Sequence, residues 1–325
     1  MKVAIVQHDI LWGRPTENLA RLSLLLDHQS GADLYVLTET FATGFLAERK
    51  EEGERKKEEE VEGLPLEWLQ SQAREKNAAF AASIAVSNND SRCEVRDSRY
   101  EVRGARCEVR GARCEDSFAN RLFFVRPDGS YDYYDKRHLF GYAGETKAYV
   151  PGDRRVVVEW RGVRFLLQVC YDLRFPVWSR NCHYSSQFIV HSSSTSEAAE
   201  PSAQFIVHSS QSSRQDYDAA IYVANWPASR IDVWQTLLKA RALENQCFVI
   251  GVNRVGNDPA CHYCGGSVVI DAYGKTIAAC PDNEESVAVA TLDMERLRTF
   301  RQKFPVLDDG DDFTVHSSQF TVHSS

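Results

Sequence analysis

Short apolar runs and helically spaced apolar residues alternate along the N-terminal part of the chain. Residues 2–7 (KVAIVQ) and 33–37 (DLYVL) are rich in β-branched and aliphatic side chains, which is typical of strands. Between these runs a helix is predicted over 18–29, because leucines recur at intervals of three and four residues: Leu19, Leu22, Leu25 and Leu26. Strand, helix and strand in this order indicate the start of an α/β layered fold.

The same alternation continues toward the C-terminus. Further strands are predicted at residues 78–86, 121–125, 131–135, 156–160, 165–169, 219–224, 248–252, 267–270 and 287–292. One further helix is predicted at 64–79, with an inner face made of Leu66, Leu69 and Ala73. Another is predicted at 232–245, capped by Asp232, with Val233, Leu237, Ala240 and Leu243 on its inner face. The chain thus has about ten strands and four or five helices in largely alternating order.

Three kinds of segment interrupt this pattern. Residues 48–62 carry charges of both signs and predict a solvated face or loose loop, with a mobile entrance flap as the alternative. From Arg92 a unit of seven residues (RCEVRDS, RYEVRGA, RCEVRGA) repeats, and a second unit, QFIVHSS, recurs in 182–215 and, as variants, near the C-terminus. The first unit lacks the apolar pair of a coiled coil. We hypothesise surface insertions at about 89–116 and 182–215 and a low-complexity tail at 309–325, around a single domain spanning 1–308.

Composition narrows the class of protein. The 325 residues are 43% hydrophobic, which suffices for a substantial core, and the net charge of −8 argues against nucleic acid as a partner. The apolar run at the N-terminus is too short for a signal peptide, and no stretch approaches the roughly 20 apolar residues of a membrane span. We therefore expect a soluble, cytoplasmic protein that binds neither nucleic acid nor membrane.

The nine cysteines are irregularly spaced in a chain without an export signal, so reduced thiols are expected. Cys261 and Cys264 form one C-x-x-C pair, but a structural zinc site would need a second pair or histidines at the appropriate spacing. We therefore expect these two residues on or beside a strand, and no metal.

One cysteine has a context that suggests chemistry. Cys170 ends the apolar run 165–169, and Pro176 marks a new helix shortly after it. A cysteine on a sharp turn between strand and helix is held exposed as a nucleophile, although a buried structural cysteine is the alternative.

Glu39 and Lys136 also follow apolar strands, and the carboxyl ends of strands meet at one edge of an α/β sheet. A base, a cation and a thiol are the minimum set for acyl transfer, whereas none of the non-repeat histidines has a context that marks it as the base: His8, His28, His138, His183 and His262.

The segments LTETFATGF, YDKRHLF and LLQVCYDLRFP resemble the three signature blocks of the nitrilase, or carbon–nitrogen hydrolase, superfamily. They occur in the family's order, and the resemblance covers essentially the whole chain outside the repeats. It implies a single-domain, four-layer α-β-β-α sandwich that assembles as a homodimer or higher homo-oligomer, without a cofactor. It also implies a catalytic set of Glu39, Lys136 and Cys170, with Glu145 as a second glutamate.

The resemblance further implies a mechanism. Glu39 would deprotonate Cys170, whose thioester intermediate would form beside Lys136 and the backbone N–H of Tyr171. Alternatives are an amidase for N-carbamoyl or simple aliphatic amides, a true nitrilase, and a catalytically impaired member.

The segment CYDLRFPVWSRN with the later NWP is most similar to the omega-amidase branch, which hydrolyses the side-chain amide of 2-oxo acids such as 2-oxoglutaramate or 2-oxosuccinamate. Arg174 is the candidate for binding the substrate carboxylate. Alternatively, it forms an ion pair with Asp172 or packs under the turn that carries Cys170. Trp226 either lines the substrate site or belongs to the core.

Overall fold

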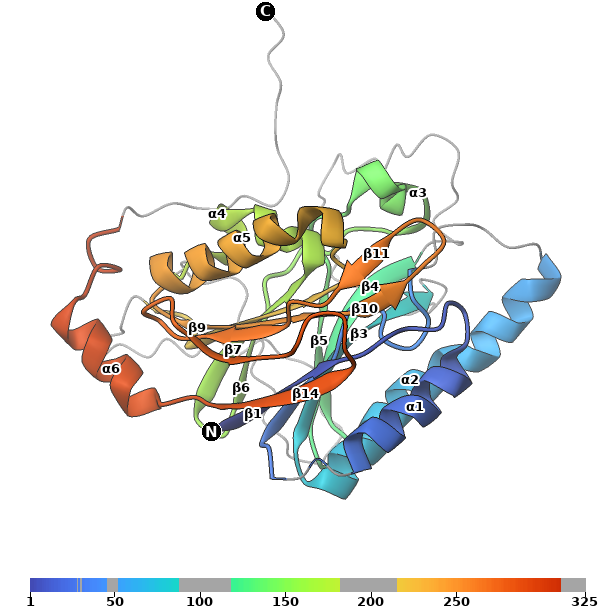
Figure 1. Ribbon diagram of the computed structural model, residues 1–325, viewed down its shortest axis with the longest axis horizontal. Coiled ribbons are helices and arrows are strands. Elements are labelled where there is room, and N and C mark those ends of the chain that lie inside the picture. The colour runs from blue at the N-terminus through green and yellow to red at the C-terminus, as the bar shows by residue number, and fades with distance from the viewer. Residues whose placement is uncertain (28, 30, 46–51, 88–117, 182–214, 311–325) are drawn as a thin grey trace, which may run out of the picture.

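Two six-stranded sheets face each other in the computed structural model, and each is covered by helices on its outer face (Figure 1). The structure describes residues 1–27, 29, 31–45, 52–87, 118–181 and 215–310. This arrangement confirms the predicted α-β-β-α sandwich. The hypothesised insertions and tail lie almost entirely outside the described residues, as do His28 and His183. Within the described part, no helix combines the length and apolar character needed to cross a membrane.

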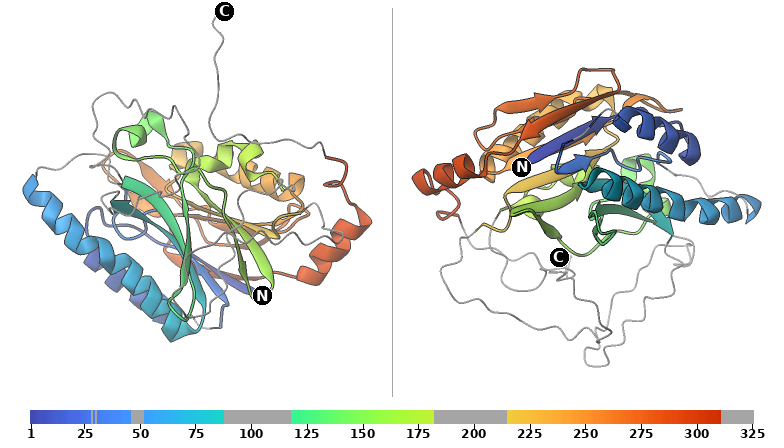
Figure 2. Two further views of the ribbon diagram at one scale, coloured as in Figure 1. Left: turned by 180° about the vertical axis from the view of Figure 1, so that it is seen from behind. Right: turned by 90° about the horizontal axis from the view of Figure 1, so that it is seen from below.

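The first sheet has the strand order β14-β1-β2-β3-β4-β5. Its strands are β1 (Lys2–Gln7), β2 (Leu34–Val36), β3 (Ala79–Ser87), β4 (Phe118–Val125), β5 (Tyr131–Asp135) and β14 (Ser286–Thr291). Helices α1 (Pro15–Asp27) and α2 (Glu52–Lys76) lie side by side on its outer face (Figure 1). Strands β1 and β14 pair antiparallel, so the two ends of the domain meet in one sheet, as both figures show (Figure 2).

The second sheet has the order β13-β12-β9-β8-β7-β6. It contains β6 (Val157–Trp160), β7 (Val163–Val169), β8 (Ala219–Ala224), β9 (Phe248–Asn253), β12 (Val268–Ile270) and β13 (Thr276–Ala279). Helices α4 (Pro176–Ser179) and α5 (Ile231–Glu244) cover its outer face (Figure 1). A separate hairpin, β10 (Val255–Asn257) and β11 (His262–Cys264), and helix α6 (Met294–Lys303) complete the domain.

The central strands are buried on both faces, which explains why they appear in the sequence as continuous apolar runs. In β1, Val3 and Ile5 belong to the core between the sheets, whereas Ala4 and Val6 belong to the core beneath α1 and α2. Rings from the two sheets meet in the middle layer, where the centroids of Phe124 and Phe165 lie 5.9 Å apart. The inter-sheet core therefore fixes how the two sheets, and the residues at their edges, face each other.

Predictions about two helices were wrong. The charged segment at 48–62 was predicted to be a solvated face or loose loop, and the loop was wrong, because from Glu52 onward the segment is the first part of α2. Glu, Lys and Arg have high helix propensity, and the helix continues into the apolar segment that packs on the sheet. In α5 the predicted inner face was misplaced, because the buried residues are Trp234, Leu238, Arg241 and Ala242, whereas Leu243 is 47% exposed. Asp232 does not cap α5, which begins at Ile231 after the short helix η4 (Ala228–Arg230).

We expect the replacement Phe165→Ala to lower the free energy of unfolding by about 3–5 kcal/mol, because it leaves a cavity between the two sheets. Urea unfolding measures this change. The control Leu24→Ala removes a side chain of α1 that is 71% exposed, and it should change the free energy of unfolding by no more than about 0.5 kcal/mol. Equal effects of the two variants would contradict the assigned core.

Candidate functional site

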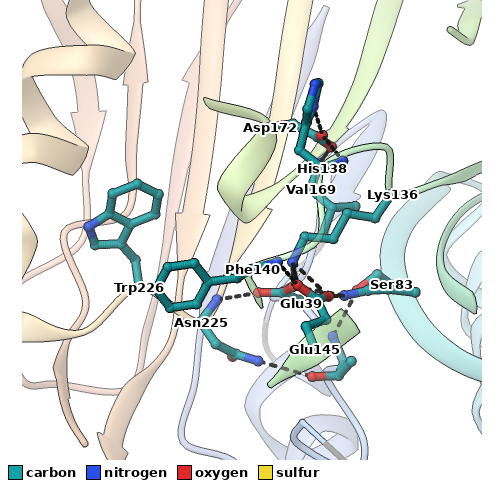
Figure 3. A network of polar contacts seen from close by, with 12 residues as sticks. Glu39, Ser83, Lys136, His138, Phe140, Glu145, Val169, Asp172, Asn225 and Trp226 are labelled. Atoms are coloured by element: carbon teal, nitrogen blue, oxygen red, sulfur yellow. Dashed lines mark hydrogen bonds and ion pairs between the residues drawn. The ribbon is translucent and has the colours of Figure 1, made fainter. Parts of the chain in front are cut away.

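Glu39, Lys136 and Cys170 lie at the carboxyl ends of β2, β5 and β7, as predicted from their positions after apolar runs. They do not share one sheet edge, however, because β2 and β5 belong to the first sheet and β7 to the second. Glu145 begins the short helix α3 (Glu145–Ala148), in the connection between β5 and β6. The four residues therefore meet where the edges of two facing sheets come together, and Figure 3 shows the polar contacts around Glu39.

The ammonium group of Lys136 lies between two carboxylates. Its Nζ atom is 3.0 Å from Oε1 of Glu39 and 2.9 Å from both carboxylate oxygens of Glu145. All three side chains are at most 4% exposed. Burial by itself favours the neutral amine, but the charges of Glu39 and Glu145 outweigh it and raise the pKa of Lys136 well above its usual range. The site therefore contains a permanent buried cation.

The carboxylate of Glu39 is held at both oxygens. Besides Lys136, Oε1 accepts a hydrogen bond from Nδ2 of Asn120 at 2.8 Å. Oε2 accepts one from the backbone N–H of Asn225 at 2.8 Å (Figure 3). The sequence analysis did not single out either asparagine. The only signal for Asn120 is a polar residue within the apolar run of β4, where it is completely buried. Asn225 gave no such signal, since it follows its strand like many loop residues.

The turn after Glu39 has an unusual backbone. Thr40 has a φ of 43°, which is rare for a β-branched residue and carries a conformational cost. Its N–H donates to Oγ of Ser83 at 2.8 Å, and its Oγ1 accepts from Nδ2 of Asn225 at 3.0 Å. These bonds to β3 and to the end of β8 hold the turn and thereby fix the direction of the Glu39 carboxylate.

Cys170 is also in the left-handed region, with a φ of 45°, where β7 passes into the short helix η3 (Cys170–Arg174). The turn is held by Asp172, which is fully buried. Its carboxylate accepts hydrogen bonds from the Val169 N–H at 3.0 Å, the Tyr134 hydroxyl at 2.9 Å and the His138 N–H at 3.0 Å. The segment that follows β5 and carries Lys136 is thus tied directly to the turn that carries Cys170.

His138 has a structural role in this connection. Its Nδ1 atom lies 2.8 Å from a carboxylate oxygen of Asp172, so Nδ1 carries the proton. Its ring stacks on Phe175 with centroids 3.7 Å apart. The histidine therefore serves the Asp172 network.

The thiol of Cys170 lies beside the Glu39 carboxylate. Burial and the negative charge of Glu39 raise the pKa of the Cys170 thiol well above its usual range, and Lys136 only partly opposes this effect. The resting site therefore holds a neutral thiol beside a carboxylate. Such a thiol becomes a nucleophile only when the carboxylate accepts its proton.

The three predicted substrate-binding residues lie around η3. The ring of Tyr171 packs against Phe140, with centroids 4.9 Å apart, and its N–H is in the first turn of η3, where backbone donors have no partner within the helix. The guanidinium carbon of Arg174 lies 5.1 Å from the ring centroid of Trp226. Asp172 is occupied by the contacts above, and the alternative ion pair between Arg174 and Asp172 does not form among the described residues.

Trp226 belongs mainly to the core. It is 3% exposed, and its ring centroid is 5.5 Å from that of Trp234 on α5. Its Nε1 donates to the backbone oxygen of Arg230 at 2.8 Å. The ring therefore supports Arg174 from the side of the core, while its N–H fixes the loop that follows β8.

The C-x-x-C pair lies at the hairpin, as expected. Cys264 is in β11, Cys261 comes just before it, and both are free thiols. Within the described ranges, no group of three or more His, Cys, Asp or Glu side chains is arranged to hold a metal ion.

Comparison with known proteins identifies the family of this site. Residues 2–302 match the carbon–nitrogen hydrolase family. The chain is 38% identical to the omega-amidase YafV of Yersinia enterocolitica, over 97% of this chain and 98% of the relative, and 27% identical to a 2-oxoglutaramate amidase of Bacillus subtilis, over 94% and 96%. The crystal structure of XC1258 from Xanthomonas campestris, a CN-hydrolase superfamily protein with an arsenic adduct in its active site, is 34% identical and has a TM-score of 0.75, with 97% of this chain and 99% of that chain covered. The chain therefore belongs to the carbon–nitrogen hydrolase family and is an amide-hydrolysing enzyme.

Proposed function

We propose that this enzyme hydrolyses the side-chain amide of a 2-oxo dicarboxylic acid monoamide, such as 2-oxoglutaramate or 2-oxosuccinamate, through a thioester at Cys170. The observation that carries the chemistry is the buried Lys136 ammonium between Glu39 and Glu145, with the neutral Cys170 thiol beside Glu39. The names of the relatives support the substrate class. Arg174 supports it too, because it is a cation on the turn that carries Cys170.

Acylation begins when Glu39 accepts the thiol proton and the sulfur of Cys170 attacks the amide carbon. The C–S bond forms as the carbonyl electron pair moves to oxygen, and this oxyanion faces the Lys136 ammonium and the backbone N–H of Tyr171. The carbonyl then re-forms and the C–N bond breaks. Protonated Glu39 gives its proton to the departing nitrogen, so that ammonia leaves and the thioester remains.

Deacylation uses the same groups, with water in place of the thiol as the attacking group. Glu39 accepts a proton from water, and the resulting hydroxide attacks the thioester carbon beside Lys136. The C–S bond breaks, the sulfur regains its proton from Glu39, and the carboxylic acid leaves. The sum is one amide and one water converted to one acid and one ammonia. In both halves Glu145 holds the Lys136 ammonium in position through two contacts of 2.9 Å.

The second candidate is an amidase for N-carbamoyl or simple aliphatic amides, because the chemistry at Cys170 does not itself select the acyl group. A panel containing 2-oxoglutaramate, an N-carbamoyl amino acid, an aliphatic amide and an aliphatic nitrile separates the candidates. Preference for 2-oxoglutaramate supports our proposal. Preference for another member of the panel would reject the proposed substrate, and inactivity toward the whole panel would indicate an impaired enzyme.

We expect Cys170→Ala to abolish ammonia release from 2-oxoglutaramate, because no other group in the site can form the thioester. A coupled ammonia assay measures the loss, and circular dichroism verifies the fold. The matched control is Cys261→Ala, which removes a partly exposed thiol at the hairpin and should retain full activity. Substantial activity of Cys170→Ala would refute covalent catalysis at this residue.

The pH dependence of Cys170 alkylation tests the role of Glu39. The carboxylate raises the pKa of the thiol, so Glu39→Gln should lower this pKa and move the alkylation profile to lower pH, although hydrolysis is lost. Iodoacetamide is suitable because it is uncharged, and the modification is followed by intact mass. Glu17→Gln, a change on the exposed surface of α1, should leave the profile in place. A profile for Glu39→Gln that stays or moves to higher pH would contradict the assigned contact.

A further inference from the structure

Two arginines near η3 differ from the other arginines of the domain. Among the described residues, Arg174 and Arg230 are the partly buried arginines with neither a hydrogen bond from the guanidinium nor an ion pair. The other buried or partly buried arginines bind backbone carbonyls, as do Arg137 and Arg180, or carboxylates, as in Arg121 with Asp135, Arg164 and Arg301 with Asp218, Arg241 with Glu244, and Arg254 with Asp9. A charge that is partly removed from water without a partner is costly unless a ligand supplies the partner.

Both guanidinium groups are placed by aromatic rings. The guanidinium carbon of Arg230 lies 5.4 Å from the ring centroid of Phe140, and that of Arg174 lies 5.1 Å from the ring centroid of Trp226. Stacking on a ring orients a guanidinium and leaves its N–H donors available at the edge. The two arginines are therefore oriented without using the donors that would bind an anion.

The supporting rings link the two arginines through a series of contacts around η3. Phe140 packs against Tyr171, with centroids 4.9 Å apart, and Trp226 donates to the backbone oxygen of Arg230 at 2.8 Å. Starting at Tyr171, contacts lead through Phe140, Arg230 and Trp226 to Arg174, which is on the same short helix. This series of contacts thus begins and ends on the segment that carries Cys170.

The same rings are attached to the residues that hold the site's carboxylates. The backbone N–H of Phe140 donates to Glu145, and Asn225, which precedes Trp226, donates to Glu39. In Figure 3 the ring of Phe140 lies between Trp226 and Glu39. The two guanidinium groups are therefore attached to the same short segments that build the candidate active site.

We infer that Arg230 is a second carboxylate-binding residue, which together with Arg174 receives the free carboxylate of the substrate and selects anionic amides over neutral ones. This inference rests on the proposed function, since it names what recognises the acid end of the 2-oxo acid monoamide. Guanidinium groups present paired donors that match a carboxylate, and two of them compensate the charge of a substrate that enters beside Glu39 and Glu145. Arg230 thus sets specificity, while the bond-breaking steps belong to Cys170, Glu39 and Lys136.

The test compares two substrates that differ only at the acid end. 2-Oxoglutaramate carries the carboxylate, and 4-oxopentanamide has a methyl group in its place. Arg230→Gln should lower kcat/KM for 2-oxoglutaramate by about 10- to 100-fold, the usual effect of losing a charge-assisted hydrogen bond, and leave kcat/KM for 4-oxopentanamide within about twofold. Arg230→Lys should restore part of the preference, because it keeps the charge without the paired donors.

Lys239→Gln is the control, since it removes a positive charge from an exposed position of α5 and should alter neither substrate. Thermal unfolding of each variant verifies the fold. An equal loss for both substrates, or no loss for either, would overturn the role of Arg230 while leaving the proposed function intact. Failure of the unmodified enzyme to hydrolyse 2-oxoglutaramate would overturn the proposed function, and the role of Arg230 with it.

Discussion

The buried ammonium of Lys136 is the constraint on which the site depends. A cation taken out of water requires compensating charge, and Glu39 and Glu145 provide it from β2 and α3. Breaking a buried pair of this kind typically costs about 3–5 kcal/mol, so the three segments are held together by the same contacts that create the site. Burial and the negative charge of Glu39 also keep the thiol of Cys170 protonated, so that in the proposed mechanism the carboxylate that suppresses the thiolate is also the base that generates it.

Two strained turns complete this arrangement. Thr40 and Cys170 both adopt positive φ values, directly after Glu39 in one case and at the nucleophile itself in the other. Such conformations persist only where surrounding contacts hold them, here the bonds of Thr40 to β3 and β8 and those of Asp172 to the segment after β5. Because the contacts of Thr40 with Asn225 and of Asp172 with His138 cross between the two sheets, the packing between the sheets and the geometry of the site are coupled.

Much of this architecture could be predicted from the sequence, and the failures have physical reasons. Strand β1 agrees with the predicted bounds because two-sided burial gives it an apolar run, and the edge strand β5 agrees because it has a distinct aromatic run. The charged half of α2 and the inner face of α5 could not be inferred from hydrophobicity alone, since the buried face of α5 includes the charged residue Arg241. Asn120 acts through contacts between strands far apart in the chain, and no local pattern encodes them.

The most direct test of the central claim is rapid acid quenching during turnover of 2-oxoglutaramate, followed by intact-mass measurement and peptide mapping. Our account predicts a mass increase equal to the acyl group, located on the peptide that contains Cys170 and formed together with the first equivalent of ammonia. Release of that first equivalent while Cys170 remains unmodified throughout, or an acyl group on a different residue, would contradict it.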